Sequence, residues 1–205
     1  METTLTEKNA MEMTLTEKNA IIVHGTPGKE EFYDPDVPCG SNHHWLPWLQ
    51  KQLIVRGISA HAPEIPQAWD PQYPLWQREF ERFDIGPATI LVGHSCGGGF
   101  LVRWLSEHKQ ATVAQVILVA PWLDPRRRKT GNFFEFSMDP DLAARTVAMT
   151  IFNSDNDDPE IHDSVRLIRE SIKGVHYREF HNYGHFCLND MHTTHFPELL
   201  ETALA

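Results

Sequence analysis

The chain has 205 residues, of which 41% are hydrophobic, enough for one domain with a substantial core. Its 28 acidic residues outnumber its 18 lysines and arginines, and the resulting charge of −10 disfavours nucleic acid or anionic membranes as partners. Three cysteines are too few for a disulfide framework, no apolar run reaches the roughly 18 residues of a membrane span, and no secretion signal opens the chain. We therefore expect a cytoplasmic protein.

The chain opens with two nearly identical segments of ten residues, METTLTEKNA and MEMTLTEKNA. One duplication is too little for a repeat architecture, which needs several stacked units. The second copy leads directly into the apolar run IIVHG. We therefore interpret residues 1–17 as a dispensable polar extension, with a swapped or regulatory arm as the alternative, and residues 18–205 as a single domain.

Beyond this extension, short β-rich runs alternate with amphipathic segments, which is typical of a parallel sheet covered by helices. The predicted strands lie at 20–25, 58–66, 88–93, 114–122, 147–154 and 175–180. The predicted helices lie at 44–57, 73–83, 98–109, 160–174 and 193–204, and the stretch 123–140 is irregular. This order predicts an α/β domain: a three-layer sandwich with a mostly parallel central sheet, helices on both faces and little or no cap domain.

The junction between the strand at 88–93 and the helix after it carries the sequence GHSCG, residues 93–97. A Gly-x-Ser-x-Gly pattern between a buried strand and a helix is typical of a nucleophile elbow. There the serine occupies a strained turn with positive φ, and the glycines allow close backbone approach. We therefore predict that Ser95 is a nucleophile. Cys96 is the less favoured candidate, because its amide rather than its thiol would face a substrate.

A serine nucleophile needs a base, and a loop after the last strand is where this architecture supplies it. His185 follows Gly184 just beyond the strand ending at Phe180, so we predict that His185 is the base. His181 is the nearest rival, but its position at the end of the strand favours a structural role. His94 precedes the serine, and its side chain is expected to point away from Ser95.

A base of this kind needs a carboxylate that fixes its tautomer, and the loop NSDNDDPE supplies several. We choose Asp158, with Asp157 second, Asp155 third and Asp124 as an outside candidate. Asp158 is also a natural N-cap, because a proline follows it at the first helical position. The chain order serine, aspartate, histidine is that of α/β-hydrolases.

The oxyanion of an acyl-transfer reaction requires two backbone donors. The amide of Cys96, directly after the nucleophile, is the first expected donor. The second is expected in the loop HGTPG after the first strand, where the amide of Thr26 is the best candidate. Trp122, Phe133 and Phe134 are candidates for an apolar substrate pocket, because they lie in segments expected to overhang Ser95.

Several segments resemble one family closely: VHGTPG, HHWLPWLQKQLIVRG, LVGHSCGG, FFEFSMDPDL, SDNDDP and YGHF. Together they are similar to the small serine hydrolases related to retinoblastoma-binding protein 9, from about residue 19 to the C-terminus. The resemblance implies a compact hydrolase with a triad of Ser95, Asp158 and His185. The second aspartate of NDDP leaves open which carboxylate aligns. No Leu-x-Cys-x-Glu occurs, so retinoblastoma binding is not implied.

Other polar clusters give weaker signals. His185, His192, His195 and Asp190 lie close in sequence, but their spacing matches no common zinc pattern, and we expect no metal. The basic run 126–129 is expected to be a solvated loop, with anion or substrate binding as the alternative. No phosphate-binding or dinucleotide-binding pattern is present, so no cofactor is expected.

These observations predict a serine hydrolase that cleaves a small carboxylic ester, thioester or amide through an acyl-enzyme. We expect it to act as a monomer or a homodimer. The alternative is a hydrolase-fold protein that has little catalysis and serves as a binding or regulatory module.

Overall fold

The computed structural model describes residues 18–205, so the predicted extension at 1–17 lies outside the described residues. Its centre is a six-stranded sheet in which every strand runs parallel to its neighbours. The strand order is β2-β1-β3-β4-β5-β6. The strands are β1 Asn19–Val23, β2 Ser59–His61, β3 Thr89–His94, β4 Val113–Val119, β5 Thr146–Ser154 and β6 His176–Phe180. The predicted parallel sheet is thus confirmed.

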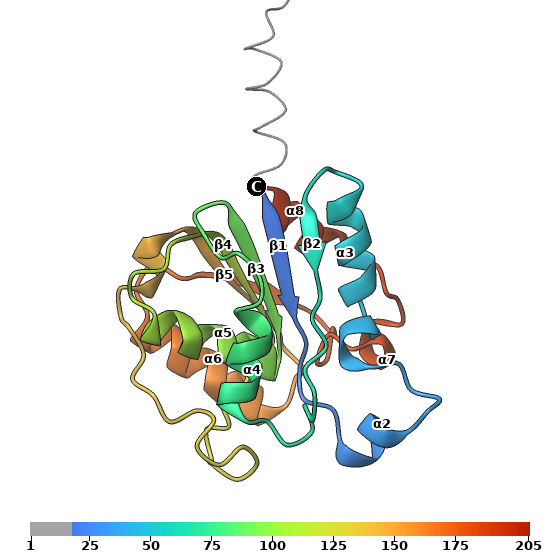
Figure 1. The fold of residues 1–205 in the computed structure, drawn as a ribbon. Coiled ribbons are helices and arrows are strands. Elements are labelled where there is room, and N and C mark those ends of the chain that lie inside the picture. The colour runs from blue at the N-terminus through green and yellow to red at the C-terminus, as the bar shows by residue number, and fades with distance from the viewer. Residues whose placement is uncertain (1–17) are drawn as a thin grey trace, which may run out of the picture.

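Helices cover both faces of this sheet (Figure 1). One face carries α4 Tyr73–Phe80, α5 Cys96–Glu107 and α6 Pro159–Ser171, and the other carries α3 Leu46–Ile54 and α8 Pro197–Leu204. The short elements are α2 Lys29–Tyr33, α7 Leu188–Met191 and the 3₁₀ turns η1 Gly40–Asn42 and η2 Leu142–Arg145. Within residues 18–205 no further domain is inserted over the sheet, so the predicted three-layer sandwich without a cap is confirmed.

The core lies where β3 and β4 pass between the two helical layers. Every residue of β3 is buried, and so are most residues of α5, which follows it directly. A central parallel strand is covered on both faces, so its sequence must be apolar throughout rather than alternating. This explains why the continuous apolar run at 88–93 predicts a strand.

The edges of the sheet and the connecting loops differ more from the prediction. The strand expected within 58–66 shrinks to Ser59–His61, because the prolines that follow it cannot donate to a ladder. The closing helix begins at Pro197 rather than at 193. The helices α2 and α7 were not predicted. No helix within residues 18–205 combines the length and the apolar character that a bilayer crossing needs.

Candidate active site

Ser95 lies in the sharp turn between β3 and α5. Its φ of 53° and ψ of −121° put it outside the usual regions for a residue with a side chain. The turn needs glycine nearby, since a Cβ on Gly97 would lie 2.4 Å from the carbonyl oxygens of Val23 and His24. The neighbours of Ser95 are buried while Ser95 itself is partly exposed. The predicted elbow geometry is therefore present, and the serine is open to a ligand.

His185 follows β6 and is oriented by an aspartate. Its Nδ1 lies 3.1 Å from Oδ1 and 3.0 Å from Oδ2 of Asp157. The Asp157 side chain is 2% exposed and that of His185 is 30% exposed. A buried carboxylate on Nδ1 selects the tautomer whose Nε2 is free to accept a proton. Among the described residues Ser95 Oγ makes no hydrogen bond, but Ser95 and His185 line the same cavities.

The choice of Asp158 as the partner of His185 is wrong, and Asp157 takes that place. Asp158 Oδ1 instead accepts the amide N–H of Glu160 at 2.8 Å and caps α6. Asp158 is in the extended conformation, where consecutive side chains point in opposite directions. One carboxylate of the pair can therefore face the histidine while the other faces the helix end.

The other two candidate carboxylates are also used elsewhere. Asp155 pairs with His181 and accepts the amide N–H of Asn182. Asp124 accepts backbone N–H groups from the three residues 128–130, so its carboxylate shapes the basic loop. Neither is the residue that orients His185.

The loop after β1 passes directly beside Ser95. A Cβ on Gly25 would lie 3.0 Å from Ser95 Cβ, and Thr26 lines both cavities that Ser95 reaches. His24 fixes this loop: its Nδ1 donates to the Gly25 carbonyl at 2.7 Å, and its Nε2 accepts the Ile65 amide at 3.0 Å. Burial lowers the pKa of His24, so the ring is neutral and keeps both bonds. The role of the Thr26 and Cys96 amides as oxyanion donors stays a prediction.

The Cys96 thiol is fully buried under this loop. Burial raises the pKa of Cys96 well above its ordinary value, against the lowering effect of a hydrogen bond to Thr26. A buried neutral thiol is a poor nucleophile. The geometry therefore favours Ser95 over Cys96.

Two cavities meet at Ser95. The larger, about 440 Å³, lies between the loop after β1 and the segment 31–46, and the smaller, about 410 Å³, lies toward α6. They share the lining residues Thr26, Pro27, Ser95 and His185. An ester has two parts on either side of its carbonyl carbon, and the arrangement offers a separate space for each.

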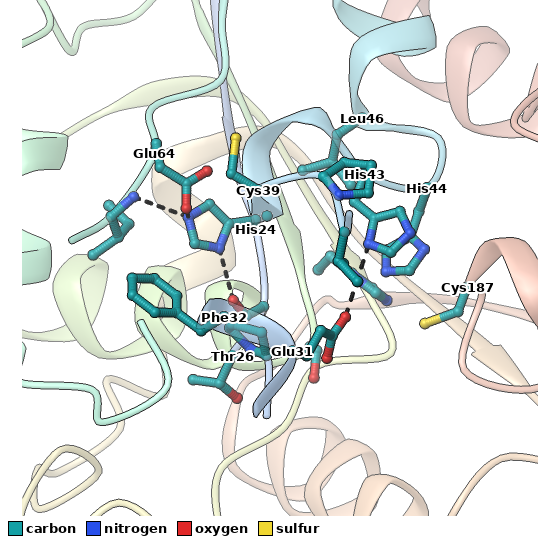
Figure 2. A pocket seen from close by; sticks show the side chains of 18 of the residues that line it. His24, Thr26, Glu31, Phe32, Cys39, His43, His44, Leu46, Glu64 and Cys187 are labelled. Carbon is teal, nitrogen blue, oxygen red and sulfur yellow. Dashed lines mark hydrogen bonds and ion pairs between the residues drawn. The ribbon is translucent and has the colours of Figure 1, made fainter. Parts of the chain in front are cut away.

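The walls of the two cavities differ in character. The larger contains several histidines and the carboxylates of Glu31 and Glu64, and among residues 18–205 no lysine or arginine lines it. Figure 2 shows His24 beside Glu64 and His43 beside Glu31. The smaller contains the indoles of Trp69 and Trp122. No local sequence pattern marks the histidines at 43 and 44 or the two glutamates as site residues, since only the fold brings their segments to Ser95.

The three predicted pocket aromatics lie in three different surroundings. Trp122 lines the smaller cavity, as expected. Phe133 is wrong as a pocket residue, because it is fully buried against Tyr73 and Trp76. Phe134 packs against Trp122 and lines a separate cavity that does not reach Ser95.

The weaker candidate for a zinc site does not form a cluster. Asp190 Oδ2 accepts the backbone N–H groups of His185 and Cys187, while the His195 ring stacks on Trp48. Among residues 18–205 no three histidine, cysteine, aspartate or glutamate side chains converge as metal ligands.

A family model described as "Serine hydrolase" matches residues 39–201. The chain belongs to this serine hydrolase family. The matched range includes Ser95, Asp157 and His185, but it begins after the loop that holds Thr26.

Individual relatives agree with this serine hydrolase assignment. The Bacillus subtilis (strain 168) protein named "Putative hydrolase YdeN" is 27% identical over 166 residues, which cover 78% of this chain and 86% of that protein. The crystal structure of the ydeN gene product from B. subtilis superposes with a TM-score of 0.76 at 22% identity, covering 91% of this chain and 97% of that one. The structure of Est1E from Butyrivibrio proteoclasticus superposes with a TM-score of 0.60 at 13% identity, covering 91% of this chain and 85% of that one. These structures share the α/β-hydrolase fold with this serine hydrolase.

Proposed function

We propose that this serine hydrolase cleaves a small carboxylic ester through an acyl-enzyme on Ser95, with thioesters and amides as related substrates. One observation carries the proposal. Ser95 stands in a positive-φ turn and opens into the same two cavities as His185, whose Nδ1 is held by the buried carboxylate of Asp157. This arrangement supports the roles of nucleophile, base and orienting acid that acyl transfer requires.

The proposed reaction has two halves. His185 Nε2 takes the proton of Ser95 as Oγ attacks the carbonyl carbon, and the amides of Cys96 and Thr26 hold the oxyanion. Collapse of the tetrahedral species breaks the bond to the leaving oxygen, which receives the proton from His185. Water then adds to the acyl-enzyme in the same way, with His185 as base, and releases the acid. Asp157 stays ionised and stabilises the imidazolium that forms in each half.

The same proposal extends to how the substrate is placed, where the protein acts and what its partner is. The acyl and leaving groups occupy the two cavities that flank Ser95, with the indoles of Trp69 and Trp122 accepting an apolar group. The chain is a relative of the small hydrolases near retinoblastoma-binding protein 9, and it acts in the cytoplasm as a monomer or homodimer. Its partner is a small acyl substrate rather than nucleic acid or a membrane, which the charge of −10 supports.

Ser95→Ala tests this function directly. We expect p-nitrophenyl acetate turnover to fall by about 1,000-fold or more, because the variant has no nucleophile. Ser59→Ala, at an exposed position in the edge strand β2, is the matched control and keeps wild-type turnover. A fluorophosphonate probe is expected to modify Ser95, as mapped by peptide mass spectrometry. Near wild-type turnover by Ser95→Ala, or labelling of another serine, would remove Ser95 from the mechanism.

A further inference from the structure

His94 connects the elbow to the loop that carries the base. It is the last residue of β3 and the direct neighbour of Ser95 in the chain, and it is 3% exposed. Its Nε2 lies 2.9 Å from the carbonyl oxygen of His185, a residue 91 positions away. A carbonyl oxygen only accepts, so Nε2 carries the hydrogen and donates it. One side chain thus joins the backbone beside the nucleophile to the backbone of the base.

The loop around His185 needs such a constraint. Gly184 and Phe186, on either side of His185, both have positive φ, at 52° and 57°. Backbone in this region is strained for a residue such as phenylalanine and persists only where the surroundings hold it. His185 also lies outside the helices and strands, between the end of β6 and the start of α7.

Three hydrogen bonds fix His185 to neighbouring elements, and a weaker local one reaches its carbonyl from Cys187 Sγ at 3.7 Å. The His185 N–H donates to Asp190 Oδ2 at 3.0 Å, its ring Nδ1 contacts Asp157, and its carbonyl accepts from His94. The first two hold the residue to α7 and to the loop after β5. The third holds it to the elbow, and it is the bond that relates the position of His185 to that of Ser95.

The surroundings of His94 keep this donor in place. The rings of His44 and Trp45 pack edge-on against it, with centroids 5.8 and 5.7 Å away. Burial lowers the pKa of His94 well below its ordinary value, and the neighbouring His185 and His44 add to the effect. The ring is therefore neutral, with one N–H, and its packing directs that N–H at the His185 carbonyl.

We infer that His94 is a positioning residue: its hydrogen bond to the His185 carbonyl sets the distance between the base and Ser95. The inference rests on the proposed function, in which His185 takes the proton of Ser95. Loss of the bond lets the loop relax away from the elbow, and small displacements of a reacting group lower the rate strongly. His94 borders the larger cavity but is only 3% exposed, so its replacement changes little of the cavity wall and the loss falls on kcat rather than on KM.

A set of substitutions at position 94 tests the bond. His94→Leu keeps the bulk and removes the donor, His94→Gln places an amide N–H near the position of Nε2, and His94→Asn is one methylene too short. With p-nitrophenyl acetate we expect kcat to fall about 10- to 100-fold in His94→Leu and His94→Asn, with KM within about twofold. His94→Gln recovers most of the loss. Should His94→Leu fail to fold, the comparison of Gln with Asn carries the test.

Two further measurements separate positioning from a general loss of stability. The low-field proton resonance of His185 Nδ1–H is expected to weaken in His94→Leu and to return in His94→Gln. The matched control is Ser106→Ala at the far end of α5, which removes a buried bond to the amide of Asp139 and keeps wild-type kcat.

The outcomes distinguish this inference from the proposed function. Wild-type kcat in His94→Leu, or equal losses in the Gln and Asn variants, overturns the positioning role while Ser95→Ala remains inactive. Activity retained by Ser95→Ala instead overturns the proposed function itself. Loss of kcat in the Ser106→Ala control would assign the effect of His94 to stability.

Discussion

Two histidine–aspartate pairs lie in the same two loops, and they differ in almost every property that matters for catalysis. His185–Asp157 has a carboxylate that is 2% exposed and a ring that is 30% exposed. In His181–Asp155 the carboxylate is 36% exposed and the ring 81% exposed. His185 lines both cavities at Ser95 and Asp157 lines the smaller one, whereas the second pair lines neither.

The exposed pair has a clear structural role. Asp155 donates its N–H to the Phe180 carbonyl and accepts the amide of Asn182, so it ties the loop after β5 to the loop after β6. The Asn182 amide, followed by His181, holds the pKa of Asp155 below its ordinary value. The comparison teaches that a histidine–aspartate contact is not sufficient for a base. Burial of the carboxylate and access of the ring to Ser95 separate the two pairs.

The largest expected effect on kcat comes from replacing one of the two paired carboxylates by an amide. Asp157→Asn is expected to lower kcat for p-nitrophenyl acetate by about 10³- to 10⁴-fold, because an amide no longer selects the tautomer of His185 or stabilises its charged form. Asp155→Asn is the matched control at the exposed pair, with kcat within about threefold of wild type. Steady-state kinetics on both variants decide the matter. Equal losses would make the two pairs equivalent and break the comparison.

The pH dependence of stability extends the comparison to His44, which packs against other histidines. Burial, together with the charges that His43 and His185 would carry, lowers the pKa of His44 to about 4, against a partial opposing effect of Asp190. As the pH falls from about 6.5 to about 4, His44 is therefore protonated in the unfolded chain while it is still neutral in the native protein. The contribution of neutral His44 to the free energy of unfolding is therefore fully present above about pH 6.5 and is lost as the pH falls to about 4.

Urea unfolding between pH 7 and pH 4 measures this effect. His44→Asn keeps an acceptor for the Leu188 amide and suits the positive φ of 56° at this position, so its stability is expected to fall less steeply with acid. His176→Asn, at an exposed position of β6, is the control and keeps the wild-type slope. The same slope for His44→Asn and wild type would show that His44 is not held neutral.

The smallest effect is expected at Asp158, the neighbour of the proposed acid. Asp158→Ala removes the cap of α6 and is expected to lower the free energy of unfolding by about 1 kcal/mol, while Asp158→Asn retains it. The fall in kcat is expected to be far smaller than in Asp157→Asn. Urea unfolding and kinetics on the same preparations check both statements. A kcat loss as large as that of Asp157→Asn would restore Asp158 as the acid.

The sequence by itself determined the features that depend on local pattern. The continuous apolar run before Ser95 and the glycines around it predicted the buried strand, the turn and the helix, because each follows from the conformations that those residues allow. The position of His185 after the last strand followed from the same order of elements. Fold class and the location of the proposed nucleophile and base were therefore accessible without coordinates.

Only the tertiary structure decided which side chains meet. Asp157 and Asp158 have the same chemistry and adjacent positions, and their roles differ because one faces the His185 ring and the other the end of α6. Likewise Phe133 is core while Trp122 lines a cavity, although both lie in the stretch after β4. Side-chain direction over one or two residues depends on loop conformation, which long-range packing and hydrogen bonds set, and local sequence pattern carries little information about it.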